Sequence, residues 1–140
     1  MPTTDRFLRG YLIVTGLVLL TAAPCAFLPY SWMNAIHEGL GLGTLPDGPM
    51  TMYLARSASA LYASIGPLYL YLAHEPRIYT GLLRLIGVVK IVLGAVLLGI
   101  DLSERLPWFW IGWEGPFVMA WGVGLLVLVE RNGPSRRDGP

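Results

Sequence analysis

Residues 29–49, PYSWMNAIHEGLGLGTLPDGP, decide how the rest of this chain is read. The segment is neither a long apolar run nor a terminal tail, and it gathers a Trp, a His, two acidic residues and many Gly and Pro positions. Its apolar residues recur at helical spacing, which predicts a two-turn helix over 32–38 with Ser31 as its N-cap and Gly39 at its end. Because so short a helix cannot cross a bilayer, we expect it to lie in the membrane interface with Trp32 at headgroup depth.

Four apolar runs flank this segment, one before it and three after it. Each run is close to the roughly 20 residues that an α-helix needs to cross a hydrocarbon core of about 30 Å. The four apolar runs therefore predict an all-α fold. We expect a four-helix transmembrane bundle with the short interfacial helix between spans one and two. The membrane domain is expected to cover 1–131 and a disordered cytoplasmic tail 132–140, and the spans are expected at about 8–28, 51–73, 82–100 and 108–130.

The composition of the chain fits a protein that faces lipid. Its 140 residues have room for one domain, and charged residues make up 14% of it, whereas soluble domains are roughly a quarter charged. With 54% apolar residues the surface cannot be covered by polar groups, so the lipid bilayer is an expected partner. A net charge of +1 and scattered arginines argue against nucleic acid as a partner.

The first apolar run is expected to stay in the protein as a kinked helix. Pro24 stands directly before Cys25, the single cysteine, and this proline is unsuited to lipoprotein or signal-peptide processing. The same proline predicts a kink near the far end of the span. With one cysteine, no intrachain disulfide can form.

Basic residues predict which way the chain crosses the membrane. Seven of the 10 Lys and Arg residues fall in the amino tail, in the turn after the second span and in the carboxyl tail. Because cytoplasmic segments carry an excess of Lys and Arg, we expect both termini in the cytoplasm, with the protein in a bacterial inner membrane. The seven are Arg6, Arg9, Arg77, Arg84, Arg131, Arg136 and Arg137, and the outer face holds Arg56 and Arg105.

Small residues predict close packing between helices. Ala55, Ser59 and Ala63 recur every four residues in the second span, and Gly87 and Gly94 share one face of the third. The second span is the least apolar of the four, so most of its circumference is expected to lie against other helices.

The outer face of the predicted bundle collects the cap residues Trp32, His37 and Glu38. A metal site built from His37 with carboxylates is one interpretation, but no metal-ligand spacing supports it, and adjacent residues point to different faces of a helix. The favoured interpretation is that these residues are solvated charges and helix caps. No metal and no cofactor are predicted. His37 and His74 fall at opposite membrane ends, which argues against haem. No catalytic motif occurs, so no catalytic residue is assigned and a non-enzymatic protein is favoured.

Arg56 lies about one turn inside the outer end of the second span, where a guanidinium needs a carboxylate partner. Asp101 and Glu114 are expected at the same depth, and either could bind Arg56 through two hydrogen bonds. The hypothesis is an ion pair that ties the second span to the third or fourth. The alternative is that Arg56 binds a substrate.

Lys90 is expected near mid-membrane in the third span, where an ammonium costs at least about 2.5 kcal/mol. Thr15, Tyr62 and Ser64 are the polar groups expected within its reach. One interpretation is that its long stem reaches the cytoplasmic headgroups. The other is a role in moving protons or in binding an anionic or quinone-like ligand. The candidate ligand-binding residues are therefore Arg56, Tyr62, Lys90, Asp101 and Glu114.

Two stretches resemble known families. The run WMN-x-x-HEGLGLGTLPDGP at 32–49, followed by YLARS-x-SALYA at 53–63, resembles a group of small bacterial membrane proteins with four spans. The run LLRLIG…G at 82–94 is similar to DoxX-like proteins. Both resemblances imply a four-helix protein of the bacterial inner membrane, and neither implies an activity or a catalytic residue.

Two kinds of function stay open. The favoured one is a non-enzymatic subunit or accessory protein of a membrane complex, packed against itself (a homo-oligomer) or against a larger complex through small-residue faces. The alternative is a carrier or redox-linked protein that binds a small lipophilic or anionic molecule near Arg56, Tyr62 and Lys90. A polar cavity reaching Lys90 would favour the alternative.

Overall fold

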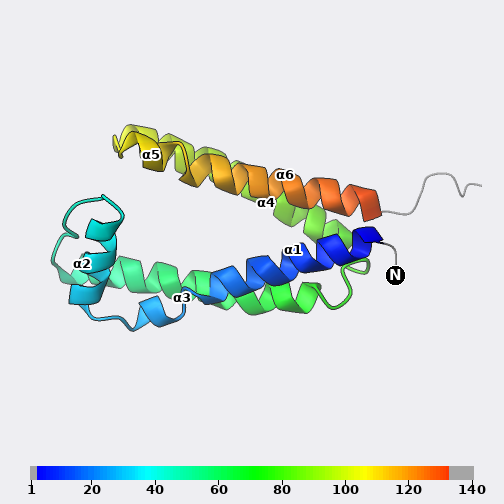
Figure 1. Cartoon of the computed structure of the whole chain (residues 1–140), viewed down its shortest axis with the longest axis horizontal. Coiled ribbons are helices and arrows are strands. Elements are labelled where there is room, and N and C mark those ends of the chain that lie inside the picture. Colours follow the sequence, from blue (N-terminus) through cyan, green and yellow to red (C-terminus); the bar gives the residue numbers. More distant parts are fainter. Residues whose placement is uncertain (1–2, 133–140) are drawn as a thin grey trace, which may run out of the picture. The chain divides into compact units, whose positions relative to one another are not determined.

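The chain is built from helices, as its apolar runs predict (Figure 1). A computed structural model describes residues 3–132, so the expected tail lies, apart from Asn132, outside the described residues. No strand occurs in the described part, and the all-α prediction is confirmed. The elements are α1 (Thr3–Leu20), the 3-10 helix η1 (Pro24–Ala26), α2 (Tyr30–Gly39), α3 (Pro49–Leu72), α4 (Thr80–Ser103), α5 (Trp108–Ile111) and α6 (Glu114–Asn132).

Two compact units can be distinguished along this chain. One is formed by Leu12–Leu72 and contains the greater part of α1, the cap and α3. The other combines the described residues up to Tyr11 with those from Ala73 to Asn132, including α4, α5 and α6. The helix α1 therefore contributes to both units.

Three segments are long and apolar enough to cross a membrane: Asp5–Ala26, Thr80–Ser103 and Trp108–Asn132. They correspond to the first, third and fourth predicted spans. The last segment begins at Trp108, so it includes α5 and the rest of the tryptophan-rich turn, residues 108–113, before α6. α3 has 24 residues, as many as α4, but its arginine, serines and tyrosines keep it out of this apolar set.

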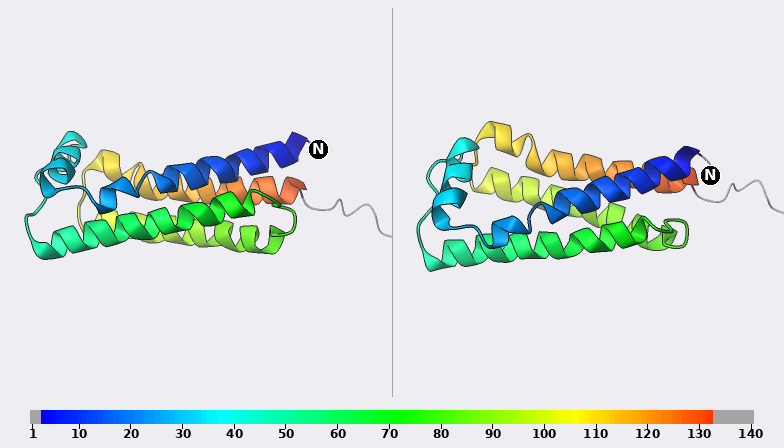
Figure 2. Two further views of the ribbon diagram at one scale, coloured as in Figure 1. Left: turned by 90° about the horizontal axis from the view of Figure 1, so that it is seen from below. Right: turned by 60° about the horizontal axis from the view of Figure 1, so that its bottom comes forward.

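The helices α4 and α6 form an antiparallel hairpin built on glycine, and both views of Figure 2 show them side by side. Gly87 on α4 faces Gly122 on α6, and Gly94 faces Gly115. A Cβ added at Gly94 would lie 2.6 Å from the Gly115 carbonyl oxygen, and one at Gly115 would lie 2.7 Å from the Gly94 carbonyl oxygen. Small residues allow helix backbones to approach this closely in membranes. The prediction that Gly87 and Gly94 share a packing face is confirmed.

In the Leu12–Leu72 unit, α1 meets α3 at another pair of glycines. A Cβ added at Gly66 would lie 2.8 Å from the Gly16 carbonyl oxygen. The α-helix stops at Leu20 and is followed by η1. The chain stays helical through η1, where the amides of Cys25, Ala26 and Phe27 donate to carbonyl oxygens three residues earlier, and the candidate membrane segment continues to Ala26. Pro24 has no amide hydrogen to donate and its ring would clash with the Leu20 carbonyl of an ideal α-helix, so the hydrogen bonds change from α to 3-10 there. The kink that the sequence predicts stays a prediction.

The cap helix α2 begins earlier than the sequence predicts. Its N-cap is Pro29, which has an extended backbone with φ of −65° and ψ of 155°. The carbonyl oxygen of Pro29 accepts hydrogen bonds from the amides of Trp32 and Met33. The assignment of Ser31 as N-cap is therefore wrong, whereas the predicted end of the helix at Gly39 is confirmed.

Candidate functional site

Asp101 is a buried acidic side chain in the α4–α6 hairpin. It follows Gly87 and Gly94 at the same seven-residue spacing, so it lies on the face of α4 that packs against α6. Its exposed fraction is 3%, and within the described residues its Oδ2 atom has no hydrogen-bond partner. The sequence predicts that the third span ends at about residue 100, just before Asp101, whereas α4 continues to Ser103 and includes Asp101.

Glu114 is the first residue of α6, and its carboxylate binds a side chain of the tryptophan-rich turn that precedes the helix. The Trp110 indole Nε1 donates a hydrogen bond to Glu114 Oε2 at 2.5 Å. A carboxylate is favoured in the first turn of a helix by the helix dipole, and Pro116 is tolerated there because its missing amide would have no partner. Glu114 therefore stabilises the start of the helix and anchors one indole ring.

Arg56 and Tyr62 lie on α3, in the Leu12–Leu72 unit. The Arg56 side chain is exposed, and its guanidinium donates a hydrogen bond to the Leu28 carbonyl oxygen at 3.2 Å. Tyr62 is also exposed. Because Asp101 belongs to the other unit, the ion pair expected between it and Arg56 stays a prediction.

The Cβ atom of Lys90 lies in the interface between α4 and α6. A Cβ added at Gly122 would lie 2.9 Å from the Cβ of Lys90, and the lysine is half-buried. Lys90 and Asp101 are eleven residues apart on one helix, which is roughly 16 Å at 1.5 Å per residue. The hairpin therefore carries these two candidate residues at different depths, and it does not bring them together in one site.

The cap is held together by hydrogen bonds from α2 to the loop that follows it. The Leu45 amide donates to Asn34 Oδ1 at 2.7 Å, and the Tyr30 hydroxyl donates to the Leu45 carbonyl oxygen at 2.6 Å. Asn34 Nδ2 in turn donates to Glu38 Oε1 at 3.0 Å. Because Tyr30, Asn34 and Glu38 recur every four residues, they line one side of α2.

The side chains of His37 and Glu38 both form hydrogen bonds with this loop. His37 Nδ1 lies 2.7 Å from the Gly43 carbonyl oxygen, and it donates to that oxygen in the tautomer that carries its hydrogen on Nδ1. Thr44 Oγ1 donates to Glu38 Oε1 at 3.3 Å. The sequence interpretation sets the two side chains on different faces, yet the loop curls far enough to meet both. Trp32 is exposed, and its position in the membrane interface stays a prediction.

A stack of aromatic rings runs along α6, and sequence analysis missed it. Trp113, Phe117 and Trp121 recur every four residues, with ring centroids 5.1 Å and 5.5 Å apart. Tyr11 of α1 adds a fourth ring at 4.7 Å from Trp121 and donates its hydroxyl hydrogen to the Trp121 carbonyl oxygen. The four-residue spacing is the signal that could have predicted the stack on α6. The partner on α1 has no such signal.

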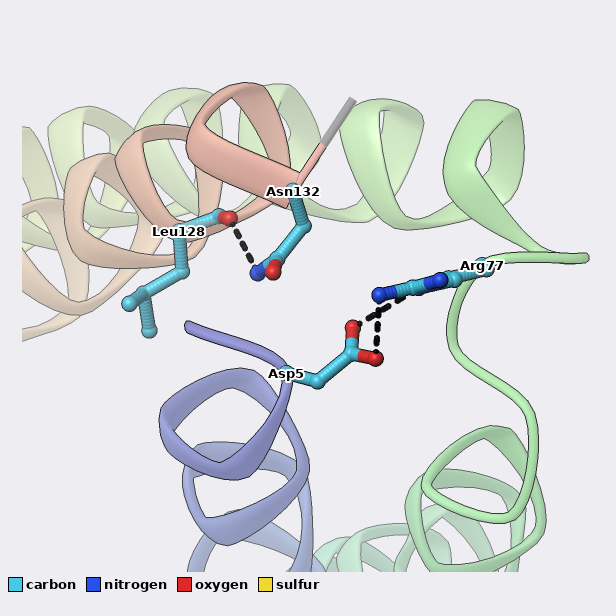
Figure 3. A network of polar contacts seen from close by, with 4 residues as sticks. All are labelled: Asp5, Arg77, Leu128 and Asn132. Carbon is cyan, nitrogen blue, oxygen red and sulfur yellow. Dashed lines mark hydrogen bonds and ion pairs between the residues drawn. The ribbon is translucent and has the colours of Figure 1, made fainter. Parts of the chain in front are cut away.

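A second missed contact ties the beginning of α1 to the turn before α4 (Figure 3). Arg77 Nε lies 3.0 Å from Asp5 Oδ1, and Arg77 Nη2 lies 2.6 Å from Asp5 Oδ2. Figure 3 also shows Asn132 close by, with its amide donating to the Leu128 carbonyl oxygen at 2.7 Å. The bidentate geometry fixes the guanidinium of Arg77 at the end of the unit where the chain begins.

No side-chain cluster in the described residues is built to hold a metal ion, because no group of three or more His, Cys, Asp and Glu residues comes together there. Comparison with protein-family models, curated proteins and solved structures finds no match for the chain. The resemblances described above therefore stay expectations. The candidate residues therefore fall into three places. Some hold the cap formed by α2 and its loop, Asp101 is a buried carboxylate beside the glycine contacts of α4 and α6, and Arg56 is exposed on α3.

Proposed function

We propose that the protein is a multi-pass protein of the bacterial inner membrane and acts as a non-enzymatic subunit or accessory protein of a membrane complex. The proposal includes four crossings, with α3 as the second span. At 24 residues and about 1.5 Å per residue, α3 is long enough to cross the hydrocarbon core.

The surface of α3 is the observation that carries this proposal. Among its exposed residues are Arg56 and two serines, Ser57 and Ser64, with Ala60 between the serines. Charged and hydroxyl groups are unfavourable against lipid, and small residues allow another helix to approach closely. A helix with such a surface is better covered by protein than by acyl chains, either by a second copy of this chain or by a larger complex.

The inner stripe predicted on α3 is a different face. Ala55, Ser59 and Ala63 are half-buried, in contrast to the exposed positions named above. α3 therefore has small residues on a face that the chain covers in part and on a face that it leaves open. The open face is the one that we assign to a partner.

The proposed orientation puts both termini in the cytoplasm. In the unit that contains α4 and α6, the beginnings of α1 and α4 and the end of α6 carry arginines. The opposite end of the hairpin carries Asp101, Glu114 and the tryptophan-rich turn. An excess of arginine on the cytoplasmic side and tryptophan at the interface both support this orientation.

The test is purification from native membranes with a mild detergent, followed by mass spectrometry of the bound proteins and lipids. We expect a homo-oligomer or a defined partner protein. The Ala60→Phe variant should lose it, because the aromatic ring blocks close approach at the exposed face of α3. Val89→Phe, at an exposed apolar position of α4, is the matched control and should retain it. A protein that stays monomeric and retains a quinone or another small molecule would favour the carrier alternative.

A further inference from the structure

Exposed arginines gather at one end of the unit that contains α4 and α6. Figure 1 shows the beginning of α1, the beginning of α4 and the end of α6 at this end. Four different segments contribute an exposed side chain here: Arg6 from α1, Arg77 from the turn after α3, Arg84 from α4 and Arg131 from α6. Lys90 is the sole lysine of the sequence, so the positive charge at this end is carried by guanidinium groups.

Three of these guanidinium groups join no ion pair with the part of the chain that the structure describes. Asp5 occupies the Arg77 side chain through two contacts. Within the described residues, no carboxylate pairs with Arg6, Arg84 or Arg131. Exposed Glu75 and Glu130 lie in the same region and reduce the net positive charge without joining an ion pair there.

Arg6, Arg77 and Arg84 are each followed in the sequence by a large apolar residue that is also exposed. Phe7 follows Arg6 and is 68% exposed, and Ile78 follows Arg77 and is 69% exposed. Leu85 follows Arg84 and is 58% exposed. A soluble anion or a nucleic acid backbone has no apolar surface that could bury these side chains. A molecule with an anionic head and an apolar tail would contact both members of each pair.

We propose that this end of the unit binds the headgroup of an anionic phospholipid. The pairs Arg6–Phe7, Arg77–Ile78 and Arg84–Leu85, together with Arg131, form the binding surface. Guanidinium groups bind phosphate oxygens through two parallel hydrogen bonds, and they stay charged at every pH that a membrane meets. The ion pair with Asp5 holds Arg77 in place, while Arg6, Arg84 and Arg131 reach the phosphate. The exposed apolar side chains contact the glycerol and the first methylenes of the acyl chains.

The experiment compares two lipids with the same acyl chains on the full chain in detergent. Native mass spectrometry measures the bound ratio of dioleoylphosphatidylglycerol to dioleoylphosphatidylcholine. Each arginine near an anionic surface contributes about a fivefold preference, so the double variant Arg6→Gln, Arg84→Gln should reduce the ratio by about 25-fold. The matched control is Arg105→Gln, which removes one charge just beyond the end of α4, at the opposite end of the hairpin, and should leave the ratio unchanged, whereas Arg84→Gln alone should lower it about fivefold.

Three outcomes would overturn the proposal. The first is an unchanged ratio in the double variant, provided that its thermal unfolding in phosphatidylcholine matches that of the unaltered protein. The second is an equal decrease in Arg84→Gln and Arg105→Gln, because net charge would then account for the preference. The third is displacement of the lipid by inorganic phosphate at equal concentration, which would identify a site for a free anion. Should the double variant fail to fold, Arg131→Gln is used in its place and should lower the ratio about fivefold.

Discussion

At the scale of single residues, glycine sets the distance between α4 and α6. Backbone atoms of one helix occupy the space that a side chain would need on the other, at Gly94 and Gly115 most closely. A flexible side chain could turn away from such a clash, but a carbonyl oxygen within a helix cannot. The two helices therefore tolerate no added atom at these positions.

Gly94→Ala should destabilise the protein by about 1–3 kcal/mol, because the new methyl group overpacks the seam. The added Cβ would lie 2.6 Å from the Gly115 carbonyl oxygen and 2.8 Å from the Met119 amide nitrogen. Chemical unfolding in detergent, followed by circular dichroism, measures the change.

Gly99→Ala is the matched control on the same helix, since nothing lies within 4 Å of a Cβ added there. It should be neutral or slightly stabilising, because alanine favours a helix by up to about 1 kcal/mol over glycine. Equal destabilisation by both substitutions would contradict the close contact between α4 and α6.

The buried carboxylate of Asp101 leads to a second prediction. Asp101→Asn keeps the shape of the side chain and removes the charge of an oxygen that has no partner within the described residues. A buried charged group without a partner costs more than about 1–3 kcal/mol, so the variant should be more stable at neutral pH. The same unfolding assay measures it. A loss of stability matched by Arg56→Gln would instead support the ion pair that the sequence predicts.

At the scale of elements, the cap shows how polar side chains organise a loop that has no core of its own. Gly41 and Gly43 have φ values of 74° and 82°, which favour glycine, and they turn the chain back toward α2. Asn34 then accepts the Leu45 amide and donates to Glu38, so one side chain connects the loop to the helix. Sequence periodicity predicts the helix, but it carries no information about which loop amide an asparagine will meet.

Asn34→Ala should release the loop, because the substitution removes both hydrogen bonds of this side chain. The exchange rate of the Leu45 amide hydrogen is expected to rise about tenfold, which corresponds to the loss of one hydrogen bond of roughly 1 kcal/mol or slightly more. Hydrogen exchange measured by mass spectrometry of peptides that cover 40–50 reports it.

Ser31→Ala is the control for the cap. Ser31 is exposed and lies after the N-cap, so its hydroxyl is not needed to start α2. Exchange at Leu45 should stay as in the unaltered protein. If Ser31→Ala increased exchange as much as Asn34→Ala did, the assignment of Pro29 as N-cap and the role of Asn34 would both be contradicted.

At the scale of the whole molecule, the apolar runs predict most of the helices, because hydrophobic length is a local property. Three of the four predicted spans are long and apolar enough to cross a membrane. The exact ends depend on other effects. Before Pro24 the α-helix α1 gives way to the 3-10 helix η1, and α4 continues past its apolar run to include Asp101.

Contacts between distant residues could not be predicted from the sequence. The ion pair of Asp5 with Arg77 and the ring contact of Tyr11 with Trp121 join residues that lie far apart in the chain. Nothing in their local spacing indicates these partners. The candidate ligand residues Arg56, Lys90 and Asp101 were selected by charge and depth, and the structure places the first in one unit and the other two in the other.

Whether α3 crosses the membrane is the central claim, and labelling of single cysteines at its two ends tests it most directly. In a Cys25→Ser background, Asp47→Cys precedes α3 and Glu75→Cys follows it, and both positions are exposed. Spheroplasts are treated with a maleimide that cannot cross membranes, before and after permeabilisation. A crossing α3 predicts labelling of position 47 from outside, and labelling of position 75 after permeabilisation alone. Labelling of both positions from outside would contradict the four-span account.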